Sequence, residues 1–218
     1  MPNDISIKKL ILVPATITLA VTLLRLAGEL MHWSPTLFNP EAGGGGAIVG
    51  IAWLVPVFGI YFGLKLTNAG HAPSAAGPAI AYSVLGFALM PALGFAAVKL
   101  GVPPQSFAAF GVFIVLSAIG AAVAYRAWPA LGRTLAAYGL AARVPVILVM
   151  LLAMLGNWGT HYDVPPPNFP EHGPMVKWLL IGVLPQLTIW MWFTIAGGAI
   201  FGAIAAAVAG RSRRPATA

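Results

Sequence analysis

The sequence predicts an all-α fold: a polytopic integral membrane bundle of six transmembrane helices, with both termini in the cytoplasm. Three observations support this prediction. Of 218 residues, 59% are hydrophobic and only 8% are charged, whereas soluble domains carry about 25% charged residues. Six apolar stretches are long enough to cross a bilayer, and the lysines and arginines separate to one side of the resulting bundle. A chain with so few charges cannot cover itself with a polar surface, so its expected solvent and first partner is the lipid bilayer.

A spanning helix needs about 20 mostly apolar residues to cross a hydrocarbon core of about 30 Å. The stretches that qualify are residues 9–31, 46–66, 77–100, 106–128, 143–160 and 176–206. The first follows Lys8-Lys9 and continues past Arg25 without a convincing cleavage site, which indicates a retained signal anchor. Residues 1–210 therefore form a single transmembrane domain, and residues 211–218 form a basic cytoplasmic tail.

The orientation follows from the basic residues, which concentrate in cytoplasmic loops. With the N-terminus inside, the cytoplasmic side holds Lys8, Lys9, Lys65, Arg126, Arg133, Arg143, Arg211, Arg213 and Arg214. The external side holds only Lys99 and Lys177. An even number of crossings is needed to keep this asymmetry, in agreement with six helices. A basic, alanine-rich chain of this kind is typical of a bacterial inner membrane.

Residues 129–142 and the sixth apolar stretch have patterns that predict how they pack. Residues 129–142 place Leu131, Leu135 and Tyr138 at helical spacing, with Arg133 opposite, which predicts a helix lying in the membrane interface. The Ala- and Gly-rich run of the sixth stretch predicts close helix packing through small residues, within the chain or with other membrane subunits.

Most candidate binding residues map to the predicted outer face. Arg25, Glu29 and His32 lie near the outer end of the first helix, and residues three and four apart share one helix face. A charge within a membrane segment suggests a functional site. Structural pairing, or an arginine whose head reaches the headgroups, is the alternative interpretation.

The loop between the fifth and sixth helices carries the second half of this outer cluster. The predicted ligand-binding set is Arg25, Glu29, His32, His161, Tyr162, Asp163, Glu171 and His172. Whether the two halves meet in space is left open by the sequence. Because a histidine beside a carboxylate can change charge near neutral pH, the group His161, Tyr162 and Asp163 also suggests pH-dependent behaviour.

A divalent metal is a second possibility for the same residues. Glu29 and His32 have the Glu-x-x-His spacing found in di-iron helical bundles. The candidate ligands are Glu29, His32, His161, Asp163 and His172. Zinc, manganese or iron would accept such a set. A single copy of this spacing arises easily by chance, so hydrogen-bonded interface residues remain the simpler explanation.

Other chemistry is not indicated. The chain has no cysteine, which excludes disulfides and thiolate chemistry. Its net charge of +7 comes without a nucleic-acid recognition motif, and no serine-hydrolase or zinc-protease motif is present. No catalytic residue is predicted. Three hypotheses remain: a transporter or transporter subunit that binds a small ligand or ion, a non-catalytic accessory subunit of a larger complex, and an outer-face metalloenzyme.

Overall fold

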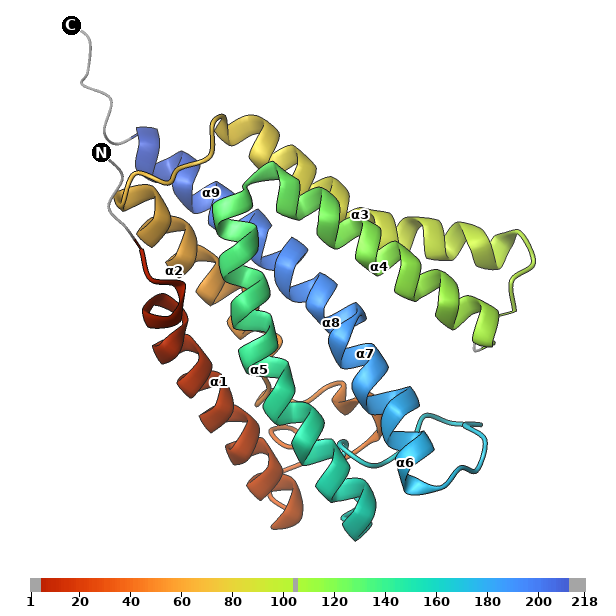
Figure 1. Ribbon diagram of the computed structural model, residues 1–218. Coiled ribbons are helices and arrows are strands. Elements are labelled where there is room, and N and C mark those ends of the chain that lie inside the picture. The colour runs from red at the N-terminus through yellow and green to blue at the C-terminus, as the bar shows by residue number, and fades with distance from the viewer. Residues whose placement is uncertain (1–4, 104–105, 212–218) are drawn as a thin grey trace, which may run out of the picture.

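The computed structural model describes residues 5–103 and 106–211, and every regular element in that part of the chain is helical (Figure 1). The elements are α1 (Ile7–Leu30), η1 (Ala42–Gly44), α2 (Leu54–Asn68), α3 (Ala76–Lys99), α4 (Phe107–Ala127), α5 (Pro129–Gly156), α6 (Pro174–Lys177), η2 (Trp178–Val183), α7 (Leu184–Leu187), α8 (Ile189–Trp192), η3 (Phe193–Gly197) and α9 (Gly198–Arg211). The all-α prediction is confirmed. Residues 212–218 of the predicted basic tail lie outside the described residues.

Five helical stretches are long and apolar enough to cross a membrane, namely Ile7–Leu30, Ala76–Lys99, Phe107–Ala127, Pro129–Gly156 and Pro174–Gly210. Large apolar side chains on their outer faces remain exposed, such as Leu12 at 64% and Phe95 at 65%. Apolar surface of this extent is stable against lipid rather than water. These features support a multi-pass membrane protein in contact with a bilayer.

The second predicted span has the wrong bounds. Helix α2 has only 15 residues and begins at Leu54, not at residue 46. The preceding segment folds back on itself, because the amides of Ile48 and Val49 donate to the carbonyls of Thr36 and Leu37. Glycines with positive φ precede it, including Gly43 at 73°, a conformation that glycine adopts at little cost. Hydropathy alone did not separate this apolar loop from a helix.

The predicted interfacial helix over residues 129–142 is also wrong. These residues form the first half of α5, a continuous helix of 28 residues that starts with Pro129 in its first turn. Leu131, Leu135 and Tyr138 are at most 1% exposed, so they belong to the protein core and not to a membrane surface. The predicted helical spacing is confirmed, but the apolar face packs against protein.

Close helix contacts explain the small residues of the sixth stretch. A side chain added at Gly59 of α2 would collide with the backbone of Gly198, and one at Gly63 would collide with that of Gly202. Leu135 of α5 packs against Gly198 from another side. Backbones approach this closely only where both helices lack side chains. These two glycines of α9 therefore pack within the chain.

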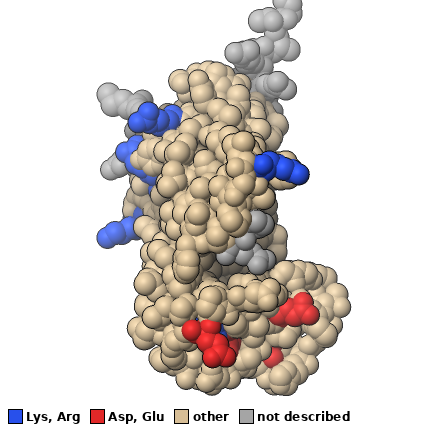
Figure 2. All heavy atoms as spheres, turned by 90° about the vertical axis from the view of Figure 1, so that its right-hand side faces the viewer, with Lys and Arg blue, Asp and Glu red and all other residues tan. Residues whose placement is uncertain are grey.

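Charge separates along the molecule. The first turn of α1 and the last turn of α9 lie at the same end of the bundle (Figure 1). On the face shown in Figure 2, basic side chains lie towards one end, and acidic side chains lie at the other. This separation agrees with the one on which the orientation was predicted. The orientation itself, with both termini cytoplasmic, stays a prediction.

The last long helix is interrupted repeatedly between residues 178 and 197. Segments η2 and η3 are π-helical, and they flank the short helices α7 and α8. Between those helices, Thr188 has φ −119° and ψ −80°, far from helical values. Pro185 contributes no amide donor to this region. Single π-helical turns are frequent at functional sites, which directs attention to the side chains between them.

Candidate functional site

Arg25, Glu29 and His161 form one buried cluster. The Nε of Arg25 donates to Oε1 of Glu29 at 2.8 Å, so the predicted pair is confirmed. The same oxygen lies 2.6 Å from Nδ1 of His161, and the His161 amide donates to Oε2 at 2.9 Å. The first helix and the fifth-to-sixth loop, 132 residues apart in sequence, therefore meet at this carboxylate.

Arg25 also connects this cluster to the loop that contains Gly44. Nη2 of Arg25 donates to the carbonyl of Gly44 at 2.8 Å and to that of Asn39 at 3.1 Å. The side chain of Glu29 is fully buried, and that of Arg25 is 10% exposed. Each charged side chain in this cluster has a charged or polar partner, which is the condition under which buried charges are tolerated.

Burial holds the pKa of the His161 imidazole below its usual value of 6.5, although the Glu29 carboxylate acts in the opposite direction. The ring is therefore neutral near pH 7. An ionised carboxylate only accepts hydrogen bonds, so Nδ1 of His161 carries the proton that faces Glu29. Burial likewise raises the pKa of the Tyr162 phenol, whose hydroxyl donates to the carbonyl of Thr22 at 3.2 Å.

Asp163 stabilises the loop that carries His161 through hydrogen bonds to neighbouring residues. Its carboxylate accepts hydrogen bonds from the amides of Gly159 and Thr160 and from the Thr160 hydroxyl, at 3.0, 2.8 and 2.6 Å. The residue is 5% exposed. These local contacts hold the turn that presents His161 and Tyr162 to the first helix.

The remaining three predicted site residues, His32, Glu171 and His172, are exposed and lie outside this cluster. The His172 ring contacts Phe169, with centroids 5.6 Å apart. Among the described residues, no group of three or more His, Asp or Glu side chains is placed to hold a metal ion. The candidate metal ligands thus do not converge on one point.

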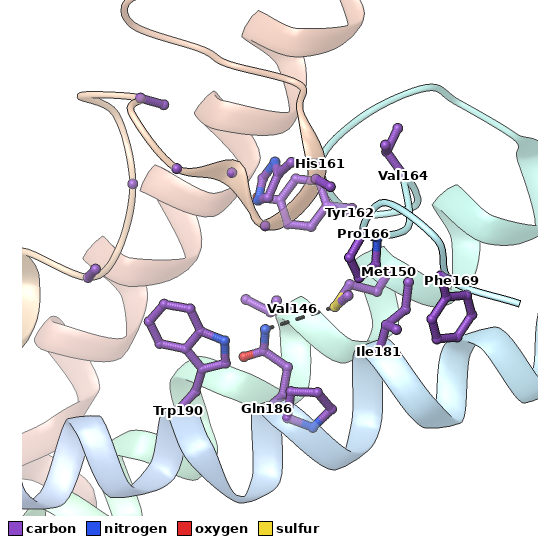
Figure 3. A pocket seen from close by; sticks show the side chains of 18 of the residues that line it. Val146, Met150, His161, Tyr162, Val164, Pro166, Phe169, Ile181, Gln186 and Trp190 are labelled. Atoms are coloured by element: carbon purple, nitrogen blue, oxygen red, sulfur yellow. Dashed lines mark hydrogen bonds between the residues drawn. The ribbon is translucent and has the colours of Figure 1, made fainter. Parts of the chain in front are cut away.

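A cavity of about 1170 Å³ lies next to the cluster. Its walls come from α1, the start of α4, the second half of α5, the interrupted helix and the loops 42–53 and 161–170. Of the eight predicted site residues, Arg25, His161 and Tyr162 are on its wall. Figure 3 shows Gln186 and Trp190 of the interrupted helix facing this space, with Val146 and Met150 of α5 beside them.

Arg143 also lines the cavity, and its predicted position was wrong. It was assigned to the cytoplasmic side, but it lies within α5 and is 3% exposed. It is 14 residues beyond the start of α5, which corresponds to about 21 Å along an α-helix. The sequence carried no plain signal for this position, because α5 continues through an internal proline, Pro145, of a kind that ordinarily kinks or ends a helix.

The partners of Arg143 are neutral. Its Nη2 donates to the Thr194 hydroxyl at 3.3 Å, and its guanidinium lies 4.9 Å from the centroid of the Trp190 ring. Its Nε has no hydrogen-bond partner. Within residues 5–103 and 106–211, no carboxylate is within ion-pair distance of this guanidinium.

Gln186 is the second incompletely satisfied group on the wall. It is 8% exposed, and its Oε1 has no hydrogen-bond partner. Its Nε2 makes only a long contact of 3.9 Å with the sulfur of Met150, drawn as a dashed line in Figure 3. Buried polar atoms are almost always paired in native proteins. Two side chains on one cavity wall, Arg143 and Gln186, therefore each keep an unpaired polar atom.

No protein-family description, no curated protein and no solved structure matches this chain.

Proposed function

We propose that the protein is a multi-pass membrane protein that binds a small molecule in the cavity bounded by α1, α4, α5 and the interrupted helix, and acts as a transporter or a transporter subunit. The observation that carries the proposal is a large cavity with two buried side chains on its wall, Arg143 and Gln186, each of which has one polar atom without a hydrogen-bond partner. Ligand sites are mostly apolar pockets with a few polar groups that fix orientation. This cavity has that composition.

The position of the cavity favours a ligand that enters from the predicted external side. Its lining residues belong to the later turns of α1, the second half of α5 and the loops at that end, whereas the start of α1 and the end of α9 lie at the other end. The interrupted helix supports a transport role, because broken helices commonly form substrate sites in transporters. An accessory subunit remains the alternative, but the glycines of α9 that suggested a partner surface pack on α2.

The test is to fill the cavity. Ile181 lines it, whereas Leu179, two residues earlier, is 46% exposed. We expect Ile181→Trp to abolish the small-molecule adducts that native mass spectrometry detects after gentle solubilisation, and Leu179→Trp to retain them. Size exclusion and helical content would verify that both variants fold. Equal adducts on both folded variants, or none on the unmodified protein, would remove the support for a ligand-binding cavity.

A further inference from the structure

We infer that the occupant of this cavity is an amphiphile with an anionic carboxylate or phosphate head, which binds at Arg143, and with a hydrogen-bond donor that reaches Gln186. This inference rests on the proposed function, because it names the ligand class of the same cavity. It depends on the charge balance of the wall, the position of the two incompletely paired side chains on it and the apolar remainder of the lining.

Charge is the first step. The cavity wall carries two arginines, and among the described residues that line it there is no carboxylate. Arg25 already meets Glu29 at 2.8 Å. Arg143 is deeply buried, and its hydrogen-bond and ring partners, Thr194 and Trp190, are both neutral. Since arginine does not lose its proton in proteins, and an unpaired buried charge is costly, the wall lacks one negative charge at Arg143.

Geometry is the second step. Arg143 contacts Trp190 and Thr194, while Met150, seven residues further along α5, contacts Gln186. Gln186 lies four residues before Trp190, so both incompletely paired side chains lie where α5 faces the interrupted helix. The Nε of Arg143 needs an acceptor, and the Oε1 of Gln186 needs a donor. A head group that carries an anionic oxygen and a nearby hydroxyl or amine satisfies both.

The apolar remainder is the third step. Polar side chains such as Arg25, His161 and Asn168 also reach the wall, but most of it is apolar, with side chains such as Phe110, Phe113, Met150 and Ile181. A free phosphate or a sugar would leave this surface without a partner. An acyl or similar chain would cover it, at about 25 cal/mol for each Å² of apolar surface removed from water.

The experiment compares head groups on one chain length. The full chain in dodecyl maltoside is titrated with tritiated hexadecanoate, hexadecyl phosphate, hexadecanol and hexadecyltrimethylammonium, and saturable binding is measured above that of empty micelles. We expect the carboxylate and the phosphate to bind at least about 10-fold more tightly than the alcohol and the cation, because hydrogen bonds to charged groups are the stronger ones. Inorganic phosphate alone is expected not to compete.

Variants connect the preference to its residue. Arg143→Gln is expected to remove the preference for anions while leaving hexadecanol binding unchanged. The matched control is Arg133→Gln, which makes the same charge change at an exposed position of the same helix and should alter nothing. If Arg143→Gln does not fold, Arg143→Lys keeps the charge and is expected to retain the preference for anions over the alcohol. A loss of that preference in a folded Arg143→Lys protein would count against a charge-based site.

The donor position has its own test. A lysophosphatidic acid with a hexadecanoyl chain carries a free hydroxyl near its phosphate, and it is expected to bind more tightly than hexadecyl phosphate. Gln186→Leu should abolish that advantage without affecting hexadecyl phosphate. The same variants in nanodiscs with phosphatidylglycerol distinguish a membrane lipid from a soluble amphiphile, since only a lipid ligand would occupy the cavity without added probe.

Two failures are distinguishable. Saturable binding that is equal for all head groups and indifferent to Arg143→Gln would overturn the anionic head and leave the ligand-binding cavity intact. An absence of saturable binding for every probe, together with no adducts on the unmodified protein, would overturn the proposed function as well.

Discussion

Two buried arginines face the same cavity in opposite circumstances. Arg25 is held by the Glu29 carboxylate and by the carbonyls of Gly44 and Asn39. Arg143 has one hydroxyl and one aromatic ring, and its Nε has no partner. The first arginine joins α1 to the loops, so its charge is used in holding the structure together. The charge of the second has no carboxylate partner among the described residues. The two arginines are similarly buried, so they differ in their partners and not in their burial.

The largest expected effect comes from breaking the Arg25 cluster. Glu29→Gln would leave a buried guanidinium without its counter-charge, and breaking a buried pair in this way costs about 3–5 kcal/mol. We expect that loss in the free energy of unfolding, measured by chemical denaturation in micelles. Glu41→Gln is the control, because Glu41 is exposed and such substitutions change stability by about 0.5 kcal/mol or less. Equal losses for the two variants would mean that the cluster does not hold the loops.

The second effect is a dependence on pH. His161 faces Glu29 and Arg25 of α1 and lies beside Tyr162 and Asp163 of its own loop. Because its pKa is lowered in the folded protein, the unfolded chain binds more protons between that pKa and 6.5. Stability from this group is therefore complete above pH 6.5 and falls as the pH is lowered below it.

Thermal unfolding between pH 5 and pH 8 would show this trend, and His161→Gln should flatten it. His172→Gln is the matched control, since His172 is exposed. A profile that stays equally steep in His161→Gln would assign the pH dependence to another group.

A smaller effect is expected at the edge of the cluster. Tyr162→Phe removes one hydrogen bond, from the phenol to the Thr22 carbonyl, and should lower the free energy of unfolding by about 0.5–1.5 kcal/mol. Chemical denaturation beside Glu29→Gln provides the comparison. A loss as large as that of Glu29→Gln would mean that the Tyr162 phenol, and not the Glu29 carboxylate, is the main link between the loop and α1.

The smallest expected effect is at Arg143. Arg143→Met loses the Thr194 contact and the stacking on Trp190, but it also removes a buried charge without a carboxylate partner. Replacing buried charges with apolar side chains is often neutral or stabilising, so we expect a change of at most about 1 kcal/mol, or a gain. A loss comparable to that of Glu29→Gln would show that both arginines are structural.

The sequence was sufficient for the helices that are long, apolar and bounded by turns. It predicted the first, third and fourth spans to within a few residues, because their lengths match a bilayer and polar or Gly-Pro segments end them. It failed at residues 129–142, where apolar side chains are buried by protein rather than lipid, and at residues 46–53, where an apolar segment forms a partly exposed loop and not a helix. Hydropathy does not distinguish these two apolar surroundings.

The candidate site was predicted in part. The Arg25–Glu29 pair follows from helical spacing, since four residues separate the two on one helix. The contact between Glu29 and His161 does not follow, because it depends on how two segments far apart in sequence pack. Arg143 was misplaced for a related reason: two arginines ten residues apart resembled a cytoplasmic loop, although the second lies well inside a continuous helix. Whether the predicted residues bind a ligand stays a prediction.

The π-helical segments have a consequence for comparing sequences across species. A π turn holds one more residue than an α turn, and a single residue corresponds to about 100° of rotation around the helix axis. Deleting one residue from 178–183 would allow an ordinary helix to re-form, while turning Trp178 and the loop before it away from Gln186 and Trp190. Single-residue gaps in this segment, more than substitutions, would therefore indicate orthologues in which the cavity has been lost.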